Sequence, residues 1–269
     1  MKHTDTPSAY ARVMQARANT RPTALDYIEK IFPDFFELHG DRRFGDDPAV
    51  VGGLATLNGR PCTVIGIEKG HTAAQRTQHH FGAPSPEGYR KAQRLMRQAE
   101  KFSRPVVCLI DTSGAGCTME AEQRGQGQAI AESLMIMSSL QTPILSIFIG
   151  EGGRVGALAL AVADEVWMLE NAIYSVVSPE GCASILWKDA ERAAEAAQNL
   201  RLTAQDALEL GVADAIIDER DLGSDAFYAA LSKHITKKLD MLCQMPVRDL
   251  TARRYARFRA FGNCEKTEA

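Results

Sequence analysis

Two long apolar runs, each followed at once by a glycine-rich turn and a helical pattern, constrain the fold more than any other feature of the chain. Residues 105–110 lead into Asp-Thr-Ser-Gly-Ala-Gly (111–116), and residues 143–149 lead into Gly-Glu-Gly-Gly-Arg-Val-Gly-Ala (150–157). Continuous apolar strands that alternate with helices are typical of parallel strands covered on both faces. The chain is therefore predicted to be an α/β protein with a largely parallel sheet.

Further elements are expected on both sides of these runs. Asn58-Gly59 predicts a hairpin between strands at 50–55 and 62–67. Leu25, Ile28, Ile31 and Phe32 predict the apolar face of a helix that ends at Pro33, after an arm or short helix at 1–20. Helices are also expected at 87–102, 120–140, 154–163, 203–210 and 227–261, strands at 165–169, 172–177 and 215–218, and a long basic loop at 68–86.

Composition excludes several classes of protein. The chain has 269 residues, is 45% hydrophobic and 24% charged, and carries a formal net charge of −3, so neither nucleic acid nor an anionic membrane is an expected partner. No apolar run is long enough to cross a bilayer, and the first residues lack a secretory pattern. The six cysteines are scattered without a CxxC motif, so no metal site is predicted, and the reducing cytoplasm is the expected compartment.

The two glycine-rich turns are the strongest candidates for chemistry. Glycine allows close backbone approach, and the first turn of the following helix offers unpaired N–H groups at the positive end of its dipole. Together these features make a site for an oxyanion or a developing enolate. The alternative is that both turns only permit tight packing. Neither turn matches a phosphate loop or the full GxGxxG dinucleotide motif.

Single polar side chains near the turns are weaker candidates. Ser113 is not in a GxSxG elbow, and Cys117 has no visible partner base. Asp111 and Glu151 follow strands and could act as an acid or base, but such carboxylates more often cap helix N-termini. Surface or ligand-contact roles are expected for the loop histidines His71, His79 and His80. The sequence therefore indicates a site that works through backbone dipoles.

Six strings, in order along the chain, carry a family resemblance. They are Arg-Pro-Thr-Ala-Leu-Asp-Tyr-Ile (21–28), Glu-Leu-His-Gly-Asp-Arg (37–42), Val-Gly-Gly (51–53), Phe-Gly-Ala-Pro-Ser-Pro-Glu-Gly-Tyr-Arg-Lys-Ala (81–92), Ile-Gly-Glu-Gly-Gly (149–153) and Tyr-Ser-Val-Val-Ser-Pro-Glu-Gly-Cys-Ala-Ser-Ile-Leu-Trp-Lys (174–188). They resemble the α subunit of the carboxyltransferase of multisubunit bacterial acetyl-CoA carboxylase. The likeness extends from about Arg21 to Phe261.

This resemblance implies a crotonase-like fold, a spiral of ββα units with helical extensions at both ends. The implied organisation is an N-terminal arm and helix at 1–36, a carboxyltransferase domain at 37–225 and a C-terminal helical tail at 226–269. It also implies a homologous β subunit that carries a zinc ribbon, in an α2β2 hetero-oligomer. The absence of CxxC in this chain agrees with the α side.

The implied reaction moves CO₂ from biotin, held covalently on a separate biotin carboxyl carrier protein, to acetyl-CoA, which gives malonyl-CoA. By position, Gly156 and Ala157 would supply the backbone donors that stabilise developing negative charge. The carboxybiotin pocket would be formed by Gly114, Ala115, Gly152, Gly153 and Val155.

Two departures from the family pattern fall in these turns. The family reads Asp-Thr-Pro-Gly-Ala-Tyr where this chain has Ser113 and Gly116, which predicts a looser and wider pocket wall. The family reads Gly-Glu-Gly-Gly-Ser-Gly-Gly-Ala where this chain has Arg154 and Val155. Val155 disfavours positive φ and adds bulk beside the expected donors. Two alternatives follow: a specialised paralogue that carboxylates or decarboxylates another acyl thioester, and a non-catalytic partner subunit.

Overall fold

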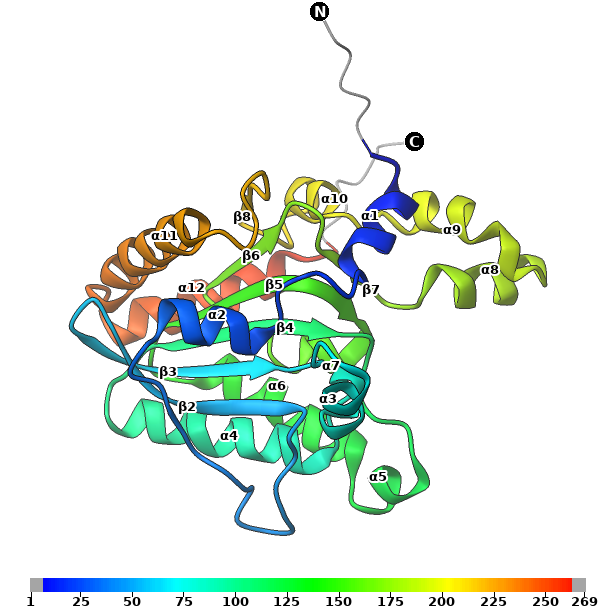
Figure 1. The fold of residues 1–269 in the computed structure, drawn as a ribbon. Coiled ribbons are helices and arrows are strands. Elements are labelled where there is room, and N and C mark those ends of the chain that lie inside the picture. The colour runs from blue at the N-terminus through cyan, green and yellow to red at the C-terminus, as the bar shows by residue number, and fades with distance from the viewer. Residues whose placement is uncertain (1–6, 263–269) are drawn as a thin grey trace, which may run out of the picture.

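The computed structural model describes residues 7–262, which form an eight-stranded mixed sheet with helices on both faces (Figure 1). Residues 1–6 of the expected arm and residues 263–269 of the expected tail, with Cys264, lie outside the described part. The order across the sheet is β1-β2-β3-β4-β5-β6-β8, and β7 also pairs with β5. The strands are β1 (Phe36–Glu37), β2 (Val50–Leu57), β3 (Arg60–Ile67), β4 (Val106–Thr112), β5 (Ile144–Gly153), β6 (Glu165–Leu169), β7 (Ile173–Ser175) and β8 (Ala215–Ile217).

The pairing of the strands confirms both predictions about the sheet. β2 and β3 form the antiparallel hairpin, and its turn has positive φ at both Asn58 (49°) and Gly59 (80°), as the right-handed twist of a two-residue hairpin requires. From β3 onward, the pairs β3–β4, β4–β5, β5–β6 and β6–β8 are all parallel. Every residue of β4, β5 and β6 is buried, which explains their unbroken apolar patterns.

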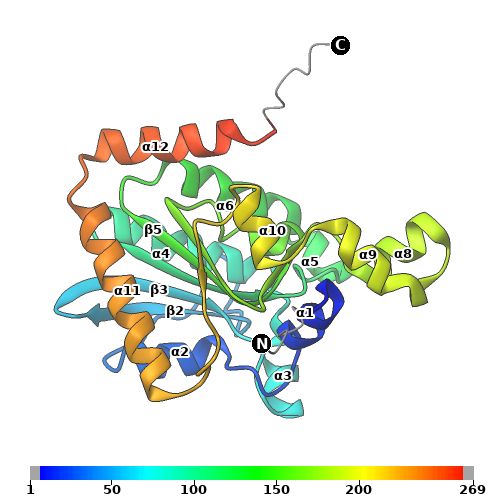
Figure 2. The ribbon, with the colours of Figure 1, turned by 90° about the horizontal axis from the view of Figure 1, so that it is seen from above.

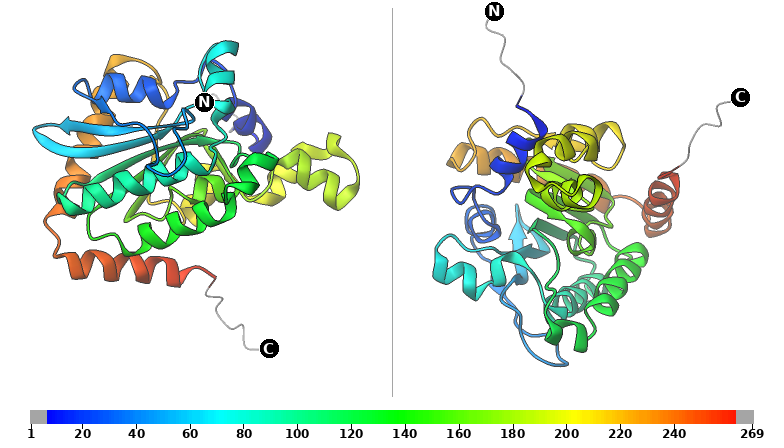
Figure 3. Two further views of the ribbon diagram at one scale, coloured as in Figure 1. Left: turned by 90° about the horizontal axis from the view of Figure 1, so that it is seen from below. Right: turned by 90° about the vertical axis from the view of Figure 1, so that its right-hand side faces the viewer.

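Helices form a layer on each side of the sheet (Figure 3, left). One side is covered by α2 (Ala24–Ile31) and α11 (Asp225–Cys243), and the other by α4 (Pro86–Lys101) and α6 (Gln126–Ser139), with α12 (Val247–Ala260) packed outside α6. The remaining helices are α1 (Ala9–Ala16), α3 (Ala73–Gln78), α5 (Met119–Gln123), α7 (Arg154–Leu158), α8 (Pro179–Trp187), α9 (Ala193–Leu200) and α10 (Ala204–Glu209). None of the helices between residues 7 and 262 is both long and apolar enough to cross a bilayer.

Helices α8 and α9 form an arm that projects from the body of the molecule (Figure 2). The arm has a small core of its own, in which Cys182, Ala183 and Ala196 are buried together. Ile185 and Leu186 on α8 are about two-thirds exposed, with 65% and 62% of their surface open to solvent. An arm that keeps large apolar side chains in solvent is typical of a surface that contacts another protein.

Four predictions of local structure were wrong in detail. The expected helix at 227–261 is broken into α11 and α12 at 244–246, where Pro246 cannot continue α11 and caps α12 instead. The expected loop at 68–86 contains α3, which begins with a capping box between Thr72 and Gln75. The expected helix at 120–140 is broken into α5 and α6 at Gly125, whose φ of 82° no helix accommodates. The expected helix at 154–163 ends at Leu158 and continues only as turns.

The apolar face of α2 also differs from its prediction. Leu25 is 38% exposed, and Tyr27 is fully buried instead, between Ile28 and the helix α11. The Tyr27 ring meets the rings of Phe227 and Tyr228 edge to face at 6.3 Å and 5.4 Å. Contact between α2 and α11, far apart in the sequence, decided which side of α2 is buried.

Candidate functional site

The two glycine-rich turns meet at one edge of the sheet. They follow β4 and β5, which are parallel neighbours, so their carboxyl ends lie side by side. The register shifts between Ile110 and Thr112, and the last paired residues are Thr112 and Gly152. The structure therefore brings the two turns together, as expected for candidate residues at the carboxyl ends of parallel strands.

Glycine is required where the two turns touch. A Cβ atom on Gly153 would lie 2.2 Å from the carbonyl oxygen of Ser113, and one on Gly156 would lie 2.4 Å from the amide nitrogen of Ala115. A Cβ on Gly152 would meet the ring of Phe148 at 2.4 Å. The main chains of the two turns pack directly against each other, so the glycines do permit tight packing, as the alternative interpretation expected. Tight packing does not exclude a chemical role.

The turn after β4 is fixed by one buried side chain. The Thr112 hydroxyl accepts a hydrogen bond from the Gly114 amide at 3.0 Å and donates one to the Gly114 carbonyl at 2.9 Å. Gly114 has a φ of 143°, in the region that favours glycine. Further along, the Gly116 amide donates to the Pro84 carbonyl at 2.8 Å. The turn is thus anchored despite the loss of the proline that the family carries at Ser113.

The turn after β5 runs directly into α7. Gly153 is the N-cap, and the left-handed residue of the turn is Arg154, with a φ of 56°. Val155 therefore carries no positive φ, and the strain expected there falls on Arg154 instead. The buried Tyr89 hydroxyl donates to the Gly156 carbonyl at 3.2 Å. Burial raises the pKa of Tyr89, so this group stays a protonated donor.

The expected donors Gly156 and Ala157 lie in the first turn of α7 and are buried. With Gly153 as the N-cap, the amides up to Gly156 have no partner within α7, whereas Ala157 is the fourth helical residue and its amide faces the carbonyl of Gly153. Val155, beside them, is 53% exposed. Val155 is therefore the residue that stands between solvent and the expected donors.

The carboxylates at the ends of β4 and β5 form ion pairs, so their expected role as helix caps was wrong. Asp111 lies 2.5 Å from the Lys69 ammonium group and accepts a hydrogen bond from the Glu151 amide at 2.7 Å. Glu151 accepts two hydrogen bonds from Arg17, at 3.0 Å from Nε and 2.8 Å from Nη2. Both carboxylates hold the turns in place, and each is paired with a basic side chain, Asp111 with Lys69 and Glu151 with Arg17.

Arg17 connects three elements that the sequence did not place together. It follows α1, contacts Glu151 at the end of β5, and donates from Nη1 to Glu180 on α8 at 2.9 Å. Burial opposes the ionisation of Glu180, but its own backbone amide at the helix start and the Arg17 guanidinium outweigh it and lower its pKa. We refer to Arg17, Glu151 and Glu180 as the arginine clamp.

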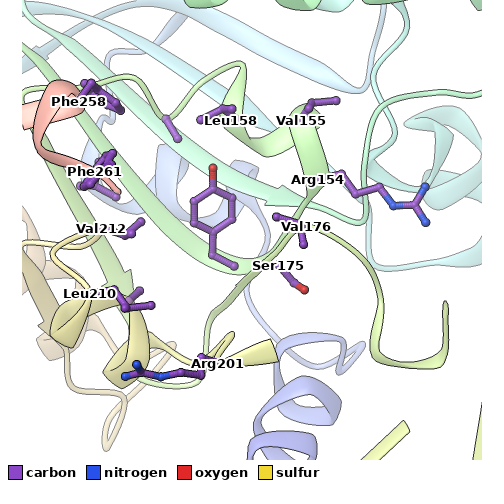
Figure 4. Close-up of a pocket in the computed structure, with 14 residues that line it drawn as sticks. Arg154, Val155, Leu158, Ser175, Val176, Arg201, Leu210, Val212, Phe258 and Phe261 are labelled. Carbon is purple, nitrogen blue, oxygen red and sulfur yellow. The ribbon is translucent and has the colours of Figure 1, made fainter. Parts of the chain in front are cut away.

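A cavity of about 520 Å³ opens beside α7 (Figure 4). Arg154 and Val155 lie on one side of it, and Phe258 and Phe261 on the other. Its lining is mostly apolar and comes from four distant segments of the chain. Tyr174 also lines it, and burial raises the pKa of this phenol to about 12, so it is neutral. The volume is in the range of small-molecule sites.

The seven predicted site residues fall into three places. Val155 lines the large cavity, and Gly152 and Gly153 border a small neighbouring depression together with Ser113. Gly114, Ala115 and Gly156 form the contact between the turns, and Ala157 follows Gly156 in α7. Sequence reasoning missed the cavity residues from the C-terminal helix, because nothing in a basic helical pattern marks Phe258 as facing a cavity.

The loop histidines differ from one another. His71 contacts Asp26 at 2.7 Å and His80 contacts Asp47 at 3.2 Å, both with exposed rings, whereas His79 is buried against the Pro48 carbonyl. Within residues 7–262 no group of three or more histidine, cysteine or carboxylate side chains is arranged to hold a metal ion. Cys117 is exposed.

Comparison with known proteins places these features in context. The family of acetyl co-enzyme A carboxylase carboxyltransferase-like proteins matches residues 4–262. The chain is 56% identical to the acetyl-coenzyme A carboxylase carboxyl transferase subunit alpha of Ruminiclostridium cellulolyticum, over 95% of this chain and 98% of that one. It is 51% identical to the corresponding subunit of Clostridium acetobutylicum, over 100% and 99%. A fused beta/alpha protein of Natranaerobius thermophilus is 55% identical over 94% of this chain and 42% of its own length.

Solved structures confirm the crotonase-like fold. The transcarboxylase 12S core superposes with a TM-score of 0.72 at 20% identity, over 90% of this chain and 46% of that one. A subunit of a Pseudomonas malonate decarboxylase hetero-tetramer superposes with a TM-score of 0.70 at 16% identity, over 88% and 97%. At these identities the likeness concerns the fold alone.

Proposed function

Because this chain belongs to the family of acetyl-CoA carboxylase carboxyltransferase α subunits, we propose that it forms the α half of an enzyme that transfers CO₂ from carboxybiotin to acetyl-CoA, giving malonyl-CoA. The observation that carries the proposal is the contact between the two glycine turns. It sets the first turn of α7 beside the mouth of an apolar cavity.

The residues around the cavity fit a flat, largely apolar ring system with one polar edge. Val155, Leu158 and Tyr174 offer apolar surface, and Tyr174 carries no charge. The amides of Gly156 and Ala157 lie next to Val155, in the first turn of α7. We propose that carboxybiotin binds against the two turns, along Gly114, Ala115, Gly152 and Gly153, and that Val155 connects this place to the cavity. The proposed hydrogen-bond donors are Gly156 and Ala157.

When bound, carboxybiotin would supply the CO₂: its bond to N1 of biotin breaks, a C–C bond forms at the methyl carbon of the thioester, and the proton that this carbon loses passes to N1. Negative charge develops on oxygen during this exchange. The amides of Gly156 and Ala157 stabilise that charge without forming a covalent bond, and each preorganised donor contributes roughly 3–4 kcal/mol in comparable enzymes. The packing of Gly156 against Ala115 keeps these donors fixed before the reaction begins.

A β subunit that carries a zinc ribbon would complete the site, and a biotin carboxyl carrier protein would deliver the biotin. Two observations support a β partner: a relative in which β and α are fused, and the exposed apolar side chains of the α8–α9 arm. Isologous pairing of two such αβ units would give α2β2.

Co-expression with a zinc-ribbon β subunit tests the proposal. The purified complex is expected to form malonyl-CoA from acetyl-CoA only when carboxylated biotin is supplied. A matched pair of variants distinguishes an effect at the proposed site from a general effect of removing an exposed valine. The pair is Val155→Ala, beside the donors, and Val247→Ala, at the exposed start of α12. Only Val155→Ala is expected to change the turnover.

Two outcomes would contradict the proposal. A folded αβ complex that transfers no carboxyl group to any acyl thioester would make the chain a non-catalytic partner. Turnover of a different thioester without carboxybiotin would identify a specialised paralogue. Mass spectrometry of a panel of acyl thioesters, with and without biotin, distinguishes these cases.

A further inference from the structure

A second pocket, of about 260 Å³, lies away from the glycine turns, between the loop after β1 and the helix α4. Five arginines line it, and we call it the arginine pocket: Arg42, Arg43, Arg90, Arg94 and Arg97. The whole chain has a net charge of −3, so this concentration of cations is a local feature and not a consequence of composition. Nothing in the proposed carboxyl transfer uses it.

Helix α4 and the preceding loop build the pocket from two sides. Arg90, Arg94 and Arg97 are spaced by four and three residues, so they share one face of α4. Arg90 is held rigidly, because its Nε donates to Asp41 at 2.8 Å and its Nη2 donates to Glu87 at 2.9 Å. Arg90 therefore lines the pocket with its charge already balanced by Asp41 and Glu87.

The neighbouring carboxylates are already used by other groups. Asp41 accepts hydrogen bonds from Arg90 and from three backbone amides of its own loop. Glu87 binds Arg90 and Arg124, and Asp46 binds Lys91 at 2.6 Å. Arg43 forms an ion pair with Glu132 at 4.0 Å. In the part of the chain that the structure describes, no carboxylate forms an ion pair with the guanidinium groups of Arg42, Arg94 and Arg97.

Two of these cations converge on one acceptor. Arg42 Nη1 donates to the His39 carbonyl at 2.8 Å, and Arg94 Nη2 donates to the same oxygen at 3.3 Å. Arg94 Nε also donates to the Gly40 carbonyl at 3.0 Å. Burial lowers the pKa of Arg94, and the charge of Arg42 lowers it further. The fold thus holds like charges together, with Arg42 in the left-handed region at a φ of 65°.

We propose that the arginine pocket binds a small anion that carries two linked phosphoryl groups, as in pyrophosphate or a nucleoside diphosphate. Guanidinium groups match phosphate oxygens in paired hydrogen bonds, and an anion between Arg42, Arg94 and Arg97 would relieve their repulsion. A single carboxylate brings one charge to three cations, whereas a diphosphate brings at least two. The size of the pocket suits a group of this kind.

Calorimetric titration of the full-length chain with pyrophosphate, at low ionic strength, tests the proposal. One saturable site per chain is expected. Arg94→Ala and Arg97→Ala should each weaken binding about tenfold or more, because each removes a charge-assisted contact. Arg97 is the cleaner variant, since it is exposed and donates no hydrogen bond within residues 7–262.

Three controls keep the result interpretable. Arg248→Ala, an exposed arginine at the start of α12, should leave the affinity unchanged. Arg94→Lys should bind more weakly than the wild-type chain, since lysine cannot make a paired contact. ADP in place of pyrophosphate decides whether a nucleoside adds to the affinity.

Two results would overturn the proposal. One is unchanged pyrophosphate affinity in the Arg94→Ala, Arg97→Ala double variant, or no saturable binding to the wild-type chain. The other is loss of pyrophosphate binding when the β subunit is added, because the pocket would then be a contact between subunits.

Discussion

The turns after β4 and β5 follow adjacent parallel strands, yet they are held in different ways. The turn after β4 is fixed locally, because the Thr112 hydroxyl forms hydrogen bonds with both the amide and the carbonyl of Gly114. The turn after β5 is fixed by distant groups: Arg17 binds Glu151, Tyr89 binds the Gly156 carbonyl, and the β4 turn packs on Gly156. The β4 turn has its main anchor within itself, with further support from Pro84 and Lys69, whereas the β5 turn depends on several distant side chains.

This difference assigns the two turns different tasks. A locally fixed turn gives a rigid wall. A turn that runs straight into α7 presents helix amides, whose direction is set by the elements that pack on it. Substitutions in the β5 turn or its supports should therefore affect the reaction more than substitutions in the β4 turn.

The largest effect is expected from Gly156→Ala. The new Cβ would lie 2.4 Å from the Ala115 amide nitrogen, so the two turns must separate. We expect about a hundredfold loss in kcat, because small displacements of a catalytic group cost about this much. Overpacking should lower the free energy of unfolding by about 1–3 kcal/mol. Steady-state kinetics and thermal denaturation of the complex measure both.

Gly127→Ala is the matched control, since it is also a helical glycine but has no neighbouring atom within 4 Å. It should leave kcat unchanged and add about 0.5–1 kcal/mol of stability through helix propensity. Equal kinetic losses in the two variants would show that contact between the turns does not set the rate.

A smaller effect is expected from Arg17→Met, which removes the arginine clamp. Glu151 keeps only 10% of its side chain exposed, so it loses its cation without gaining full hydration. We expect a loss of about 2 kcal/mol in stability and roughly tenfold in kcat. Arg220→Met, at an ion pair with 86% and 54% exposed side chains, should change neither. Similar effects of the two variants would contradict a positioning role.

The clamp also predicts a dependence of stability on pH. The pKa of Glu180 is lowered from its ordinary value of 4.5 in the folded chain. Its contribution to stability is therefore present above about pH 4.5 and is lost as the pH falls through the folded pKa. Urea denaturation at several pH values between 5 and 3 measures this contribution. The free energy of unfolding should fall less steeply with falling pH in Arg17→Met than in the wild-type chain. Parallel curves would rule out this contribution.

Thr112→Val should affect stability more than catalysis. The variant keeps the shape of a fully buried side chain but leaves the Gly114 amide without its acceptor. A loss of about 1–3 kcal/mol is expected, with kcat changed less than in Gly156→Ala. Thr251→Val is the control, at a half-buried threonine whose hydroxyl bonds only carbonyls of its own helix. A larger kinetic defect in Thr112→Val than in Gly156→Ala would reverse the assignment of tasks.

Val155→Ala should have the smallest effect and the opposite sign. It removes bulk at the mouth of the cavity without disturbing the contact of Gly156. We expect a severalfold rise in kcat/KM for free biotin as carboxyl acceptor in the reverse reaction, measured with malonyl-CoA. An unchanged value would mean that Val155 does not restrict access.

The sequence predicted the sheet and the two turns because their signals are local. Unbroken apolar runs mark β4 and β5, and Asn58-Gly59 marks the hairpin. What it missed depends on contacts between distant residues. The burial of Tyr27 follows from α11, and Arg17 lies 134 residues from Glu151. No helix was predicted at 179–187 or 193–200, where the structure forms α8 and α9.

The cavity could not be predicted for the same reason. Val155 was recognised from its place in a motif, but Tyr174 comes from β7 and Phe258 from α12, and only the folded chain brings these distant segments to one cavity. The strained residue was also misplaced, since φ/ψ in a turn depends on what packs against it. Here the close approach of Ser113 to Gly153 puts the left-handed conformation on Arg154.

The most direct test is a crystal structure of the αβ complex with biotin bound. The account predicts the ureido oxygen of biotin at about 3 Å from the amide nitrogens of Gly156 and Ala157, with the contact between Gly156 and Ala115 unchanged. A ureido oxygen held by other groups, away from both amide nitrogens, would contradict it.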